Sequence, residues 1–354
     1  MAQVGATLKA RFQGCLVGAL AGDCFGCPFE CGTCLPQGVT LLQKVAQFVQ
    51  NIKDAEKTDW NFINGKLPYT DDTAMMRSVA KSLIHCRGKY DARDMASRFA
   101  EEFAKEPDRG YGGNVVSILP ALGDEDITDI YAPARSQFDG SGSYGNGGAM
   151  RIAPVGLCSK TSLQRVIEIA GESSKLTHAN QLGYVGAILQ ACAVHIALHS
   201  DPQEFSPQAF LDKLLSITEE ITDSGVDDIY QVKLERMKDM LTRDPSTKEV
   251  KKELGNDVAA HKSVPAAIYS FLRCLRPVQG ISTDNYLERT LIYAISLDGD
   301  TDTIASMAGA IAGAFHGQDE IPHPWMDVCE DVYDAVKQAD QLYDIMQEED
   351  KDKQ

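Results

Sequence analysis

Two segments of this sequence are apolar on nearly every side and rich in alanine and glycine, and they constrain the fold more than any other feature. They span residues 181–198 and 304–315. A helix that is apolar all round must be covered on every side by other elements, and its small residues let those neighbours approach closely. The sequence contains no run of alternating strand residues and no repeat of about 20–50 residues, so it predicts an all-α bundle around these two helices.

Amphipathic segments supply the cover that such a core needs. In residues 91–105, Met95, Phe99 and Phe103 recur every four residues on one face, which predicts a helix with one buried side. The same pattern predicts helices over residues 161–176, 207–221, 226–242 and 324–346.

Polar motifs mark helix starts and the limits of the domain. Ser246 and Glu249 form a capping box, and Thr283-Asp284 predicts the start of a helix that reaches Ile295. Because no linker rich in Pro, Gly or Ser divides the chain, we expect one domain over residues 1–347. A charged, solvated tail over residues 348–354 follows it.

The balance of charge excludes whole classes of function. The 354 residues carry 51 acidic and 34 basic side chains, a formal net charge of −17. Sequence-independent binding to nucleic acids needs a basic face, so we expect no direct DNA binding. An anionic ligand must instead be held by backbone amides, helix N-termini or bound cations. No apolar run approaches the roughly 20 residues of a membrane span, so we expect no membrane association.

Cysteines and histidines form two patterns that resemble zinc sites. The CxxC pairs Cys24/Cys27 and Cys31/Cys34 are separated by three residues, whereas structural zinc sites separate such pairs by roughly 12–20. His195 and His199 have the spacing of helical ligands without the glutamate of the H-E-x-x-H motif. We therefore interpret the thiols as small buried side chains in a reducing compartment.

The N-terminal region resembles a secretory signal. Two basic residues precede an apolar stretch over residues 14–21, which ends in an Ala19-x-Ala21 pattern. That stretch is rich in glycine and runs directly into Asp23 and Glu30, so we expect an intracellular protein and leave its compartment open. The first 22 residues contain no acid, which leaves the mitochondrial matrix open.

One acidic cluster precedes a predicted helix over residues 74–86. It consists of Thr70, Asp71 and Asp72. Thr and Asp commonly cap a helix. Two adjacent carboxylates and a hydroxyl are also the oxygen ligands that Mg²⁺ or Ca²⁺ prefers. Both interpretations are open for this cluster alone.

A second acidic cluster opens the apolar segment 304–315. Asp298, Asp300 and Asp302 have the spacing of an EF-hand start, but Thr303 and Gly309 occupy the positions of its Gly and Glu. Charges that lead directly into an apolar helix are costly unless they are paired or bind a cation. We therefore expect the two acidic clusters to meet as halves of one site.

A glycine-rich loop over residues 140–148 contains five glycines with Tyr144 and Asn146 between them. The GxGxxG pattern within it follows no strand, so a Rossmann site is disfavoured. Free backbone N–H groups near a helix start at Gly147 suit a diphosphate, and the other interpretation is an ordinary flexible loop. His178 either faces a ligand or caps the apolar segment 181–198.

Taken together and in order, these motifs resemble the ADP-ribosylglycohydrolase family, closest to its type 3 branch of animal ADP-ribosyl-acceptor hydrolases. The segments that carry the resemblance are 14–19, 22–24 with Glu30, 69–74, 108–112, 142–151, 176–178 and 300–305. The resemblance implies a compact orthogonal bundle with two Mg²⁺ ions at helix N-termini, for which Mn²⁺ can substitute. It also implies an enzyme that removes ADP-ribose from acceptors.

By position, the resemblance implies that Glu30 is a mobile catalytic acid/base residue. The implied metal ligands are Thr70, Asp71, Asp72, Asp300, Asp302 and Thr303. The implied ADP-ribose contacts, with the aromatic side chains near the adenine, are Gly112, Phe138, Gly142, Ser143, Tyr144, Gly145, Asn146 and His178.

The implied chemistry suits these residue types. Glycosidic cleavage passes through an oxocarbenium-like state, which needs an acid for the leaving oxygen and a base for water. Two metal ions roughly 3.5–4 Å apart hold hydroxyls and polarise water. The resemblance implies a monomer that acts on ADP-ribosylated proteins linked through serine, on poly(ADP-ribose) and on O-acetyl-ADP-ribose, in the reversal of ADP-ribosylation after DNA damage. An arginine-specific hydrolase and a non-catalytic ADP-ribose-binding or structural relative stay open as alternatives.

Overall fold

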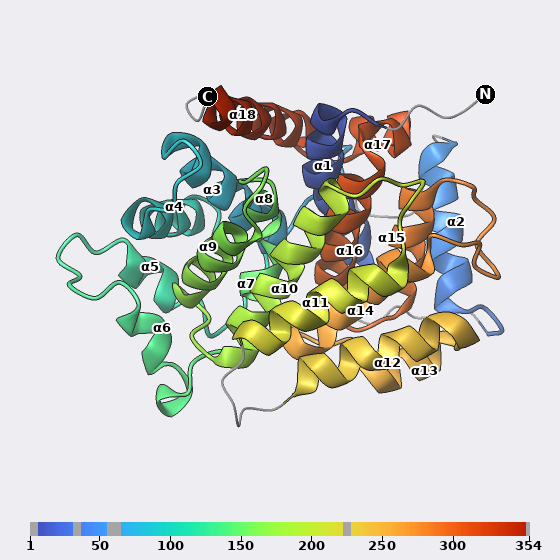
Figure 1. The fold of residues 1–354 in the computed structure, drawn as a ribbon, viewed down its shortest axis with the longest axis horizontal. Coiled ribbons are helices and arrows are strands. Elements are labelled where there is room, and N and C mark those ends of the chain that lie inside the picture. The colour runs from blue at the N-terminus through green and yellow to red at the C-terminus, as the bar shows by residue number, and fades with distance from the viewer. Residues whose placement is uncertain (1–5, 31–36, 55–64, 222–227, 352–354) are drawn as a thin grey trace.

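The computed structural model describes residues 6–30, 37–54, 65–221 and 228–351 (Figure 1). Within these residues the fold is helical, and the only extended pairings are two isolated bridges, between Leu67 and Cys329 and between Gly145 and Ala259. The α-helices are α1 Leu8–Gly26, α2 Leu41–Lys53, α3 Asp71–His85, α4 Ala92–Lys105, α5 Ile118–Leu122, α6 Ala132–Ser136, α7 Gly147–Met150, α8 Ala153–Gly156, α9 Leu163–Lys175, α10 Gln181–Leu198, α11 Pro207–Ile221, α12 Ile229–Arg243, α13 Thr247–Leu254, α14 Ala260–Arg273, α15 Tyr286–Ser296, α16 Thr301–His316, α17 His323–Val328 and α18 Val332–Lys351. Three short 3₁₀ helices are η1 Cys27–Phe29, η2 Phe138–Gly140 and η3 Gln318–Glu320. The predicted all-α class is confirmed.

Helices α10 and α16 form the centre of the bundle, as their all-round apolar character predicts. Residues 301–315 of α16 are all buried, and α16 packs against α1, α10, α14 and α15 (Figure 1). Helix α10 is in fact long and apolar enough to cross a membrane by length and composition, contrary to our expectation. However, 83% of that span is buried inside the protein, as in a core helix.

Glycines let α1 and α16 pack with their backbones in contact. Gly14 lies opposite Gly313 and Gly18 opposite Gly309, so the two helices run antiparallel. A methyl group on Gly18 would lie 2.4 Å from the carbonyl oxygen of Gly309, and one on Gly22 would lie 2.2 Å from that of Ala305. This close approach brings the C-terminal end of α1 to the N-terminal end of α16.

The structure corrects two predicted helices. The helix expected over residues 324–346 is two helices, α17 and α18, because Asp331 between them has a left-handed backbone with φ 51°. Helix α15 is capped by Asn285, whose side chain accepts a hydrogen bond of 2.7 Å from the N–H of Glu288, and not by Thr283-Asp284. The predicted cap Ser246 accepts from the N–H of Glu249 at 3.3 Å.

Helix α18 continues to Lys351 and so includes residues 348–351 of the predicted tail, while residues 352–354 lie outside the described residues. The limit of the domain at residue 347 stays a prediction.

The described cysteines and histidines do not form the zinc sites that their spacing resembles. Burial raises the pKa of Cys24 and raises that of Cys27 to about 12, so both are thiols at neutral pH, while Cys31 and Cys34 lie outside the described residues. His195 and His199 face each other with ring centroids 4.6 Å apart. In the part of the chain that the structure describes, the side-chain groups placed to hold a metal consist of carboxylates.

Candidate active site

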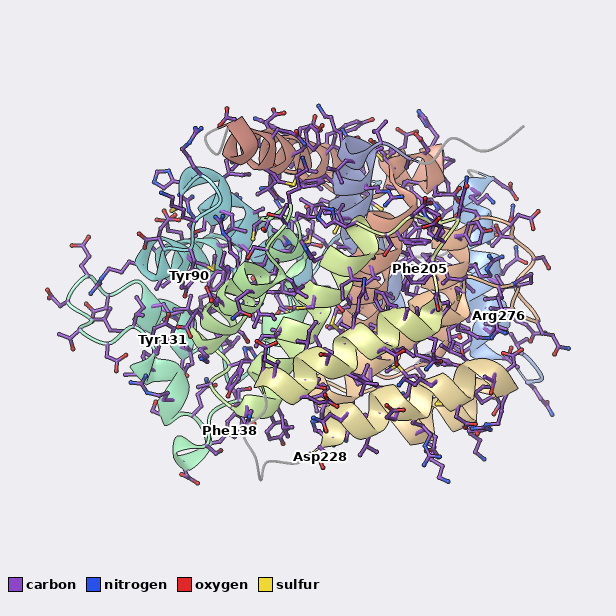
Figure 2. All side chains as sticks on the ribbon, in the orientation of Figure 1. Tyr90, Tyr131, Phe138, Phe205, Asp228 and Arg276 are labelled. Atoms are coloured by element: carbon purple, nitrogen blue, oxygen red, sulfur yellow. The ribbon has the colours of Figure 1, made fainter. Side chains whose placement is uncertain are left out.

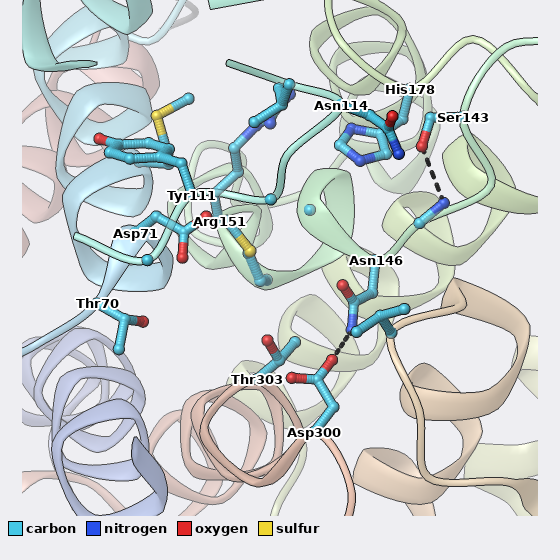
Figure 3. Close-up of a pocket in the computed structure, with 18 of the residues that line it drawn as sticks. Thr70, Asp71, Tyr111, Asn114, Ser143, Asn146, Arg151, His178, Asp300 and Thr303 are labelled. Atoms are coloured by element: carbon cyan, nitrogen blue, oxygen red, sulfur yellow. Dashed lines mark hydrogen bonds between the residues drawn. The ribbon is translucent and has the colours of Figure 1, made fainter. Parts of the chain in front are cut away.

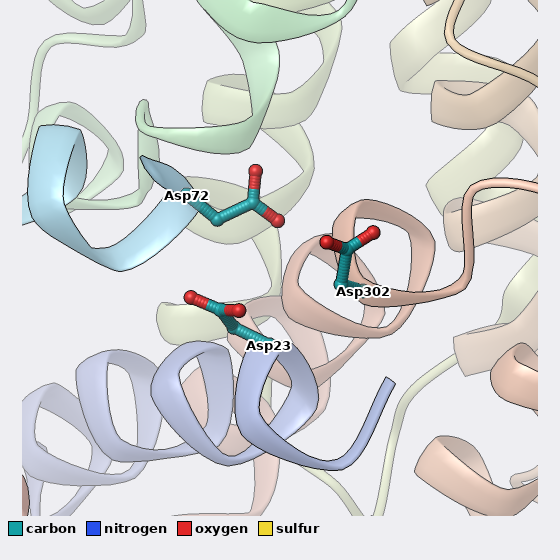
Figure 4. Close-up of side chains that lie close together, drawn as sticks. All are labelled: Asp23, Asp72 and Asp302. Carbon is teal, nitrogen blue, oxygen red and sulfur yellow. The ribbon is translucent and has the colours of Figure 1, made fainter. Parts of the chain in front are cut away.

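Three helix ends bring three carboxylates together. Asp23 comes from the last turns of α1, Asp72 from the first turn of α3 and Asp302 from the first turn of α16. One carboxylate oxygen of each lies within 4.8 Å of the others, and Figure 4 shows the three groups facing one another. The hydroxyl of Thr303 also donates to Asp72 at 3.2 Å. The predicted meeting of the two acidic clusters is therefore confirmed.

Asp23 clamps the N-terminus of α3. Its carboxylate accepts from the hydroxyl and the N–H of Thr70, at 2.9 and 3.0 Å. It also accepts from the hydroxyl and the N–H of Thr73, at 2.6 and 3.0 Å. Thr70 is the N-cap of α3, so its capping role and its place beside the acidic cluster coexist. Asp23 thus orients the turn that carries Asp71 and Asp72.

A second acidic group lies beside the first and contains Glu30, Asp300 and Asp302, again with carboxylate oxygens within 4.8 Å of one another. Asp300 follows a tight turn at Gly299, which has φ 79° and where a methyl group would lie 2.0 Å from the carbonyl oxygen of Asn256. The side-chain amide of Asn146 donates to Asp300 (Figure 3). Glu30 is exposed directly after η1, at the edge of this group.

The electrostatics of these groups favour a bound cation. Burial is the main cause of the raised pKa values of the aspartates in the two groups, which are Asp23, Asp72, Asp300 and Asp302. It also raises the pKa of the neighbouring Asp71 to about 7. The charges of neighbouring carboxylates raise the pKa of Asp72 and Asp302 further. Oδ2 of Asp72 is buried and finds no hydrogen-bond partner within the described residues. Crowded, desolvated carboxylates with an unsatisfied oxygen are the donor set that a hard divalent cation fits.

A pocket of about 380 Å³ opens over these carboxylates, within the size range of small-molecule sites (Figure 3). Most of the predicted site residues line it, namely Glu30, Thr70, Asp71, Gly112, Ser143, Gly145, Asn146, His178, Asp300, Asp302 and Thr303. Asp72 lies buried beneath it, where it contacts Thr303.

The glycine-rich loop closes tightly around His178. The N–H of Gly145 donates to the hydroxyl of Ser143 at 3.2 Å, and α7 begins at Gly147 as expected. A methyl group on Gly147 would lie 2.7 Å from the imidazole of His178. Burial lowers the pKa of His178 to about 3, so the ring is neutral, and its Nδ1 lies 2.8 Å from the hydroxyl of Thr177. A neutral ring here forms a wall of the pocket.

Three predicted contacts lie outside the pocket lining. Phe138 and Tyr144 are exposed, with relative accessibilities of 45% and 48%, and Figure 2 shows Phe138 at the surface. Their ring centroids are 6.2 Å apart. Gly142 packs against the start of α10, where a methyl group would lie 2.6 Å from the backbone nitrogen of Asn180. Gly142 therefore shapes the loop, and the two rings border it.

Comparison with known proteins decides the family. A family model described as ADP-ribosylglycohydrolase matches residues 5–352. The chain belongs to the ADP-ribosylglycohydrolase family. It is 45% identical over 352 residues to ADP-ribosylhydrolase ARH3 of Mus musculus, covering 96% of this chain and 92% of the mouse protein. It is 44% identical over 351 residues to ADP-ribosylhydrolase ARH3 of Homo sapiens, covering 96% and 94% of the two chains.

A solved structure supports the same fold. The ADP-ribosylglycohydrolase-related protein complex matches with a TM-score of 0.65 at 20% identity, covering 96% of this chain and 99% of that chain. The resemblance seen in the motifs is thus confirmed, and with it the expectation of an ADP-ribosylhydrolase enzyme.

Three parts of the pocket wall of this ADP-ribosylglycohydrolase contain residues for which the sequence predicts no individual role. Residues 110–115 form one side, and although segment 108–112 belongs to the family motifs, only Gly112 among them is predicted as a contact. Val258 reaches the pocket because its carbonyl accepts from the N–H of Asn146 at 2.9 Å, a pairing that no local pattern signals. Arg151 is buried and donates to the hydroxyl of Thr177 at 2.7 Å. Burial lowers the pKa of Arg151 to about 9, so it stays charged at neutral pH.

We expect Asp23→Asn to weaken metal binding at least tenfold and to destabilise the fold by about 1–3 kcal/mol. The new amide would place a donor against the N–H groups of Thr70 and Thr73, which loosens the turn that carries Asp71. Mn²⁺ titration by calorimetry and urea unfolding measure the two effects. Asp126→Asn, on an exposed loop, is the matched control. Unchanged Mn²⁺ affinity in Asp23→Asn would show that the clamp is dispensable.

Proposed function

We propose that this ADP-ribosylhydrolase is Mg²⁺-dependent and removes ADP-ribose from serine-linked ADP-ribosylated proteins. We propose further that it degrades poly(ADP-ribose) and O-acetyl-ADP-ribose. In each substrate it cleaves the O-glycosidic bond at the anomeric carbon of the distal ribose. The observation that carries the proposal is the placement of Glu30 beside Asp300 and Asp302 in the lining of a pocket bordered by the glycine-rich loop.

The donor set fits two divalent cations. Thr70, Asp71, Asp72, Asp300, Asp302 and Thr303 would hold them, and the unpartnered, buried oxygen of Asp72 supports this assignment. When bound, Mg²⁺ supplies positive charge that holds ribose hydroxyls and lowers the pKa of water. Oxygen ligands favour Mg²⁺ or Mn²⁺ over zinc.

The chain's own residues supply the remaining steps. Glu30 acts as the base that takes a proton from water and as the acid that gives a proton to the leaving oxygen. It is the exposed carboxylate of its group, whereas Asp300 and Asp302 are buried. Asn146 orients Asp300 through its side-chain amide. The backbone of residues 142–147 faces the diphosphate, and the exposed rings of Phe138 and Tyr144 cover the adenine.

Parallel incubation with serine-linked and arginine-linked ADP-ribosyl peptides, with and without Mg²⁺, tests the substrate class. We expect release of ADP-ribose from the serine peptide alone, and only with Mg²⁺. Release from the arginine peptide alone would select the arginine-specific alternative. Binding of ADP-ribose without release from either peptide would select the non-catalytic alternative.

Chelation should abolish turnover and lower stability together, because the carboxylates then repel one another. Mg²⁺ restored to about 100-fold above its dissociation constant should return about 2.7 kcal/mol of stability. Thermal unfolding and serine-peptide turnover, followed with Mg²⁺, Mn²⁺ or Zn²⁺ added back, measure this. Activity restored by zinc alone would show that the carboxylates are the wrong metal site.

We propose an intracellular location, in the nucleus and cytoplasm or the mitochondrial matrix. The support is chemical, because most of the free cysteines within the described residues are buried, as expected in a reducing compartment; they are Cys15, Cys24, Cys27, Cys86, Cys192, Cys274 and Cys329. Fluorescence imaging of the tagged chain in cells tests the proposal, and secretion into the medium would reject it.

A further inference from the structure

Arg109 lies at the junction between two parts of the active site. Residues 110–115 follow it in the chain and line the pocket that opens over the carboxylates, whereas Arg109 itself does not line it. Gly110 has a left-handed backbone with φ 90°, which turns the chain from Arg109 into that wall. A methyl group on Gly110 would lie 3.9 Å from the carboxylate of Asp71. Arg109 therefore joins the pocket wall to the turn that carries Asp71.

The backbone of Arg109 closes the N-terminus of α3. Its carbonyl accepts from the N–H of Asp71 at 2.7 Å. That N–H is one of the first of the helix, which find no acceptor inside the helix. The N–H of Thr73, two residues further on, donates to Asp23 at 3.0 Å. Two distant segments of the chain, one with Asp23 and one with Arg109, therefore hold this turn.

The side chain of Arg109 binds the residue that precedes the turn. Its Nη1 donates to the carbonyl oxygen of Tyr69 at 3.1 Å, and its guanidinium carbon lies 3.9 Å from the centroid of the Tyr69 ring. That distance is within the range of a cation–π contact. Tyr69 directly precedes Thr70, the N-cap of α3. Arg109 thus holds the backbone on both sides of Thr70, with its side chain before that residue and with its carbonyl after it.

Two glutamates fix the guanidinium in one orientation. Nε of Arg109 donates to Glu106 at 2.6 Å, and its two terminal nitrogens donate to the two carboxylate oxygens of Glu330, at 2.8 and 3.0 Å. Such a bidentate pair is both strong and directional. The N–H of Glu330 in turn donates to the carbonyl oxygen of Leu67 at 3.0 Å. The orientation of Arg109 is therefore set by groups on either side of it.

We propose that Arg109 is a positioning residue, which holds the turn with Asp71 and Asp72 in the geometry that binds a divalent cation. It acts through Tyr69 and the N–H of Asp71, because it does not reach the pocket. The inference rests on the proposed function for the bound cation. The contacts that hold the turn do not depend on that function.

Mn²⁺ titration of the folded full chain by calorimetry tests the role. We expect Arg109→Gln to bind Mn²⁺ about 10–100-fold more weakly than the parent chain, as when other groups that orient metal ligands are lost. The direction of the change is decisive. Loss of a positive charge near a cation site would by electrostatics alone strengthen Mn²⁺ binding. Unchanged or stronger binding by Arg109→Gln would therefore overturn the proposal.

Arg98→Gln is the matched control. Arg98 also forms a bidentate pair, with Asp94 at 2.8 and 3.0 Å, and 24% of its side chain is exposed, against 18% for Arg109. It lies on α4 outside the pocket lining, so its loss should leave Mn²⁺ affinity unchanged. An equal loss of affinity in Arg98→Gln would assign the effect to general destabilisation and would overturn the proposal.

Amide hydrogen exchange of the metal-free chain separates this inference from the proposed function. We expect exchange over residues 70–73 to be at least about tenfold faster in Arg109→Gln, and exchange in the central helix α10 to be unchanged. This result, with no Mn²⁺ binding by the parent chain, would reject the cation of the proposed function but support the hold of Arg109 on the turn. Unchanged exchange over residues 70–73, or an equal increase in α10, would overturn that hold.

A second variant keeps the test decisive if Arg109→Gln does not fold. Arg109→Lys keeps the positive charge, but one ammonium group cannot reproduce the planar fork that binds Glu106, Glu330 and Tyr69 together. We expect it to bind Mn²⁺ more weakly than the parent chain and to exchange faster over residues 70–73. Parent-like values in both measurements would overturn the proposal.

Discussion

Glu30→Gln should lose about 10²–10⁴-fold in turnover on the serine-linked substrate and keep its affinity for ADP-ribose. Glutamine has the shape of glutamate but cannot take a proton from water or return it to the leaving oxygen. Glu30 is exposed at the edge of the group that it forms with Asp300 and Asp302, so the substitution leaves the buried carboxylates in place. Single-turnover kinetics and ADP-ribose calorimetry separate the two effects.

The electrostatics of Glu30 make this result informative. Partial desolvation by the surrounding protein, and then the charges of Asp300 and Asp23, raise the pKa of Glu30 although its side chain is reached by solvent. Bound cations would oppose that shift and hold the carboxylate ionised. Glu125→Gln, on an exposed loop, is the matched control. Near-normal turnover of Glu30→Gln with intact metal content would show that Glu30 does not transfer the proton and that another group does.

Gly18→Ala should destabilise the protein by about 3 kcal/mol or more, or prevent folding, although alanine is the better helix former. The added methyl group would lie 2.4 Å from the backbone oxygen of Gly309, so it can be accommodated only if α1 and α16 move apart. That movement would also separate Asp23 from Asp302. Urea unfolding measures the loss of stability, and Mn²⁺ titration measures the loss of the metal site.

Gly171→Ala is the matched control for this prediction. Gly171 also lies inside a helix, α9, but a methyl group there would meet only the flexible end of Ile188, at 3.3 Å. The control should therefore unfold at or above the denaturant concentration of the parent chain. Equal stability of Gly18→Ala and Gly171→Ala would contradict the close packing of α1 on α16.

Local patterns in the sequence are sufficient for much of the fold. The all-round apolar character of α10 and α16 predicts their central place, because side chains at helical spacing must be buried together. The amphipathic pattern of residues 207–221 matches α11, Pro207–Ile221. The carboxylates at the starts of α3 and α16 predict a shared site, because charges beside apolar helices need compensation.

Only the tertiary structure decides which distant residues complete the site. Asp23 carries no local sign that it clamps Thr70, and Val258 enters the pocket through a backbone pairing with Asn146. The tertiary structure also decides that the chain breaks at Asp331 between α17 and α18. It likewise places Phe138 and Tyr144 outside the pocket lining. Periodicity reports which face of one helix is buried, but not against which other segment it packs. That choice depends on the close approach of α1 and α16, which brings residues far apart in sequence into contact.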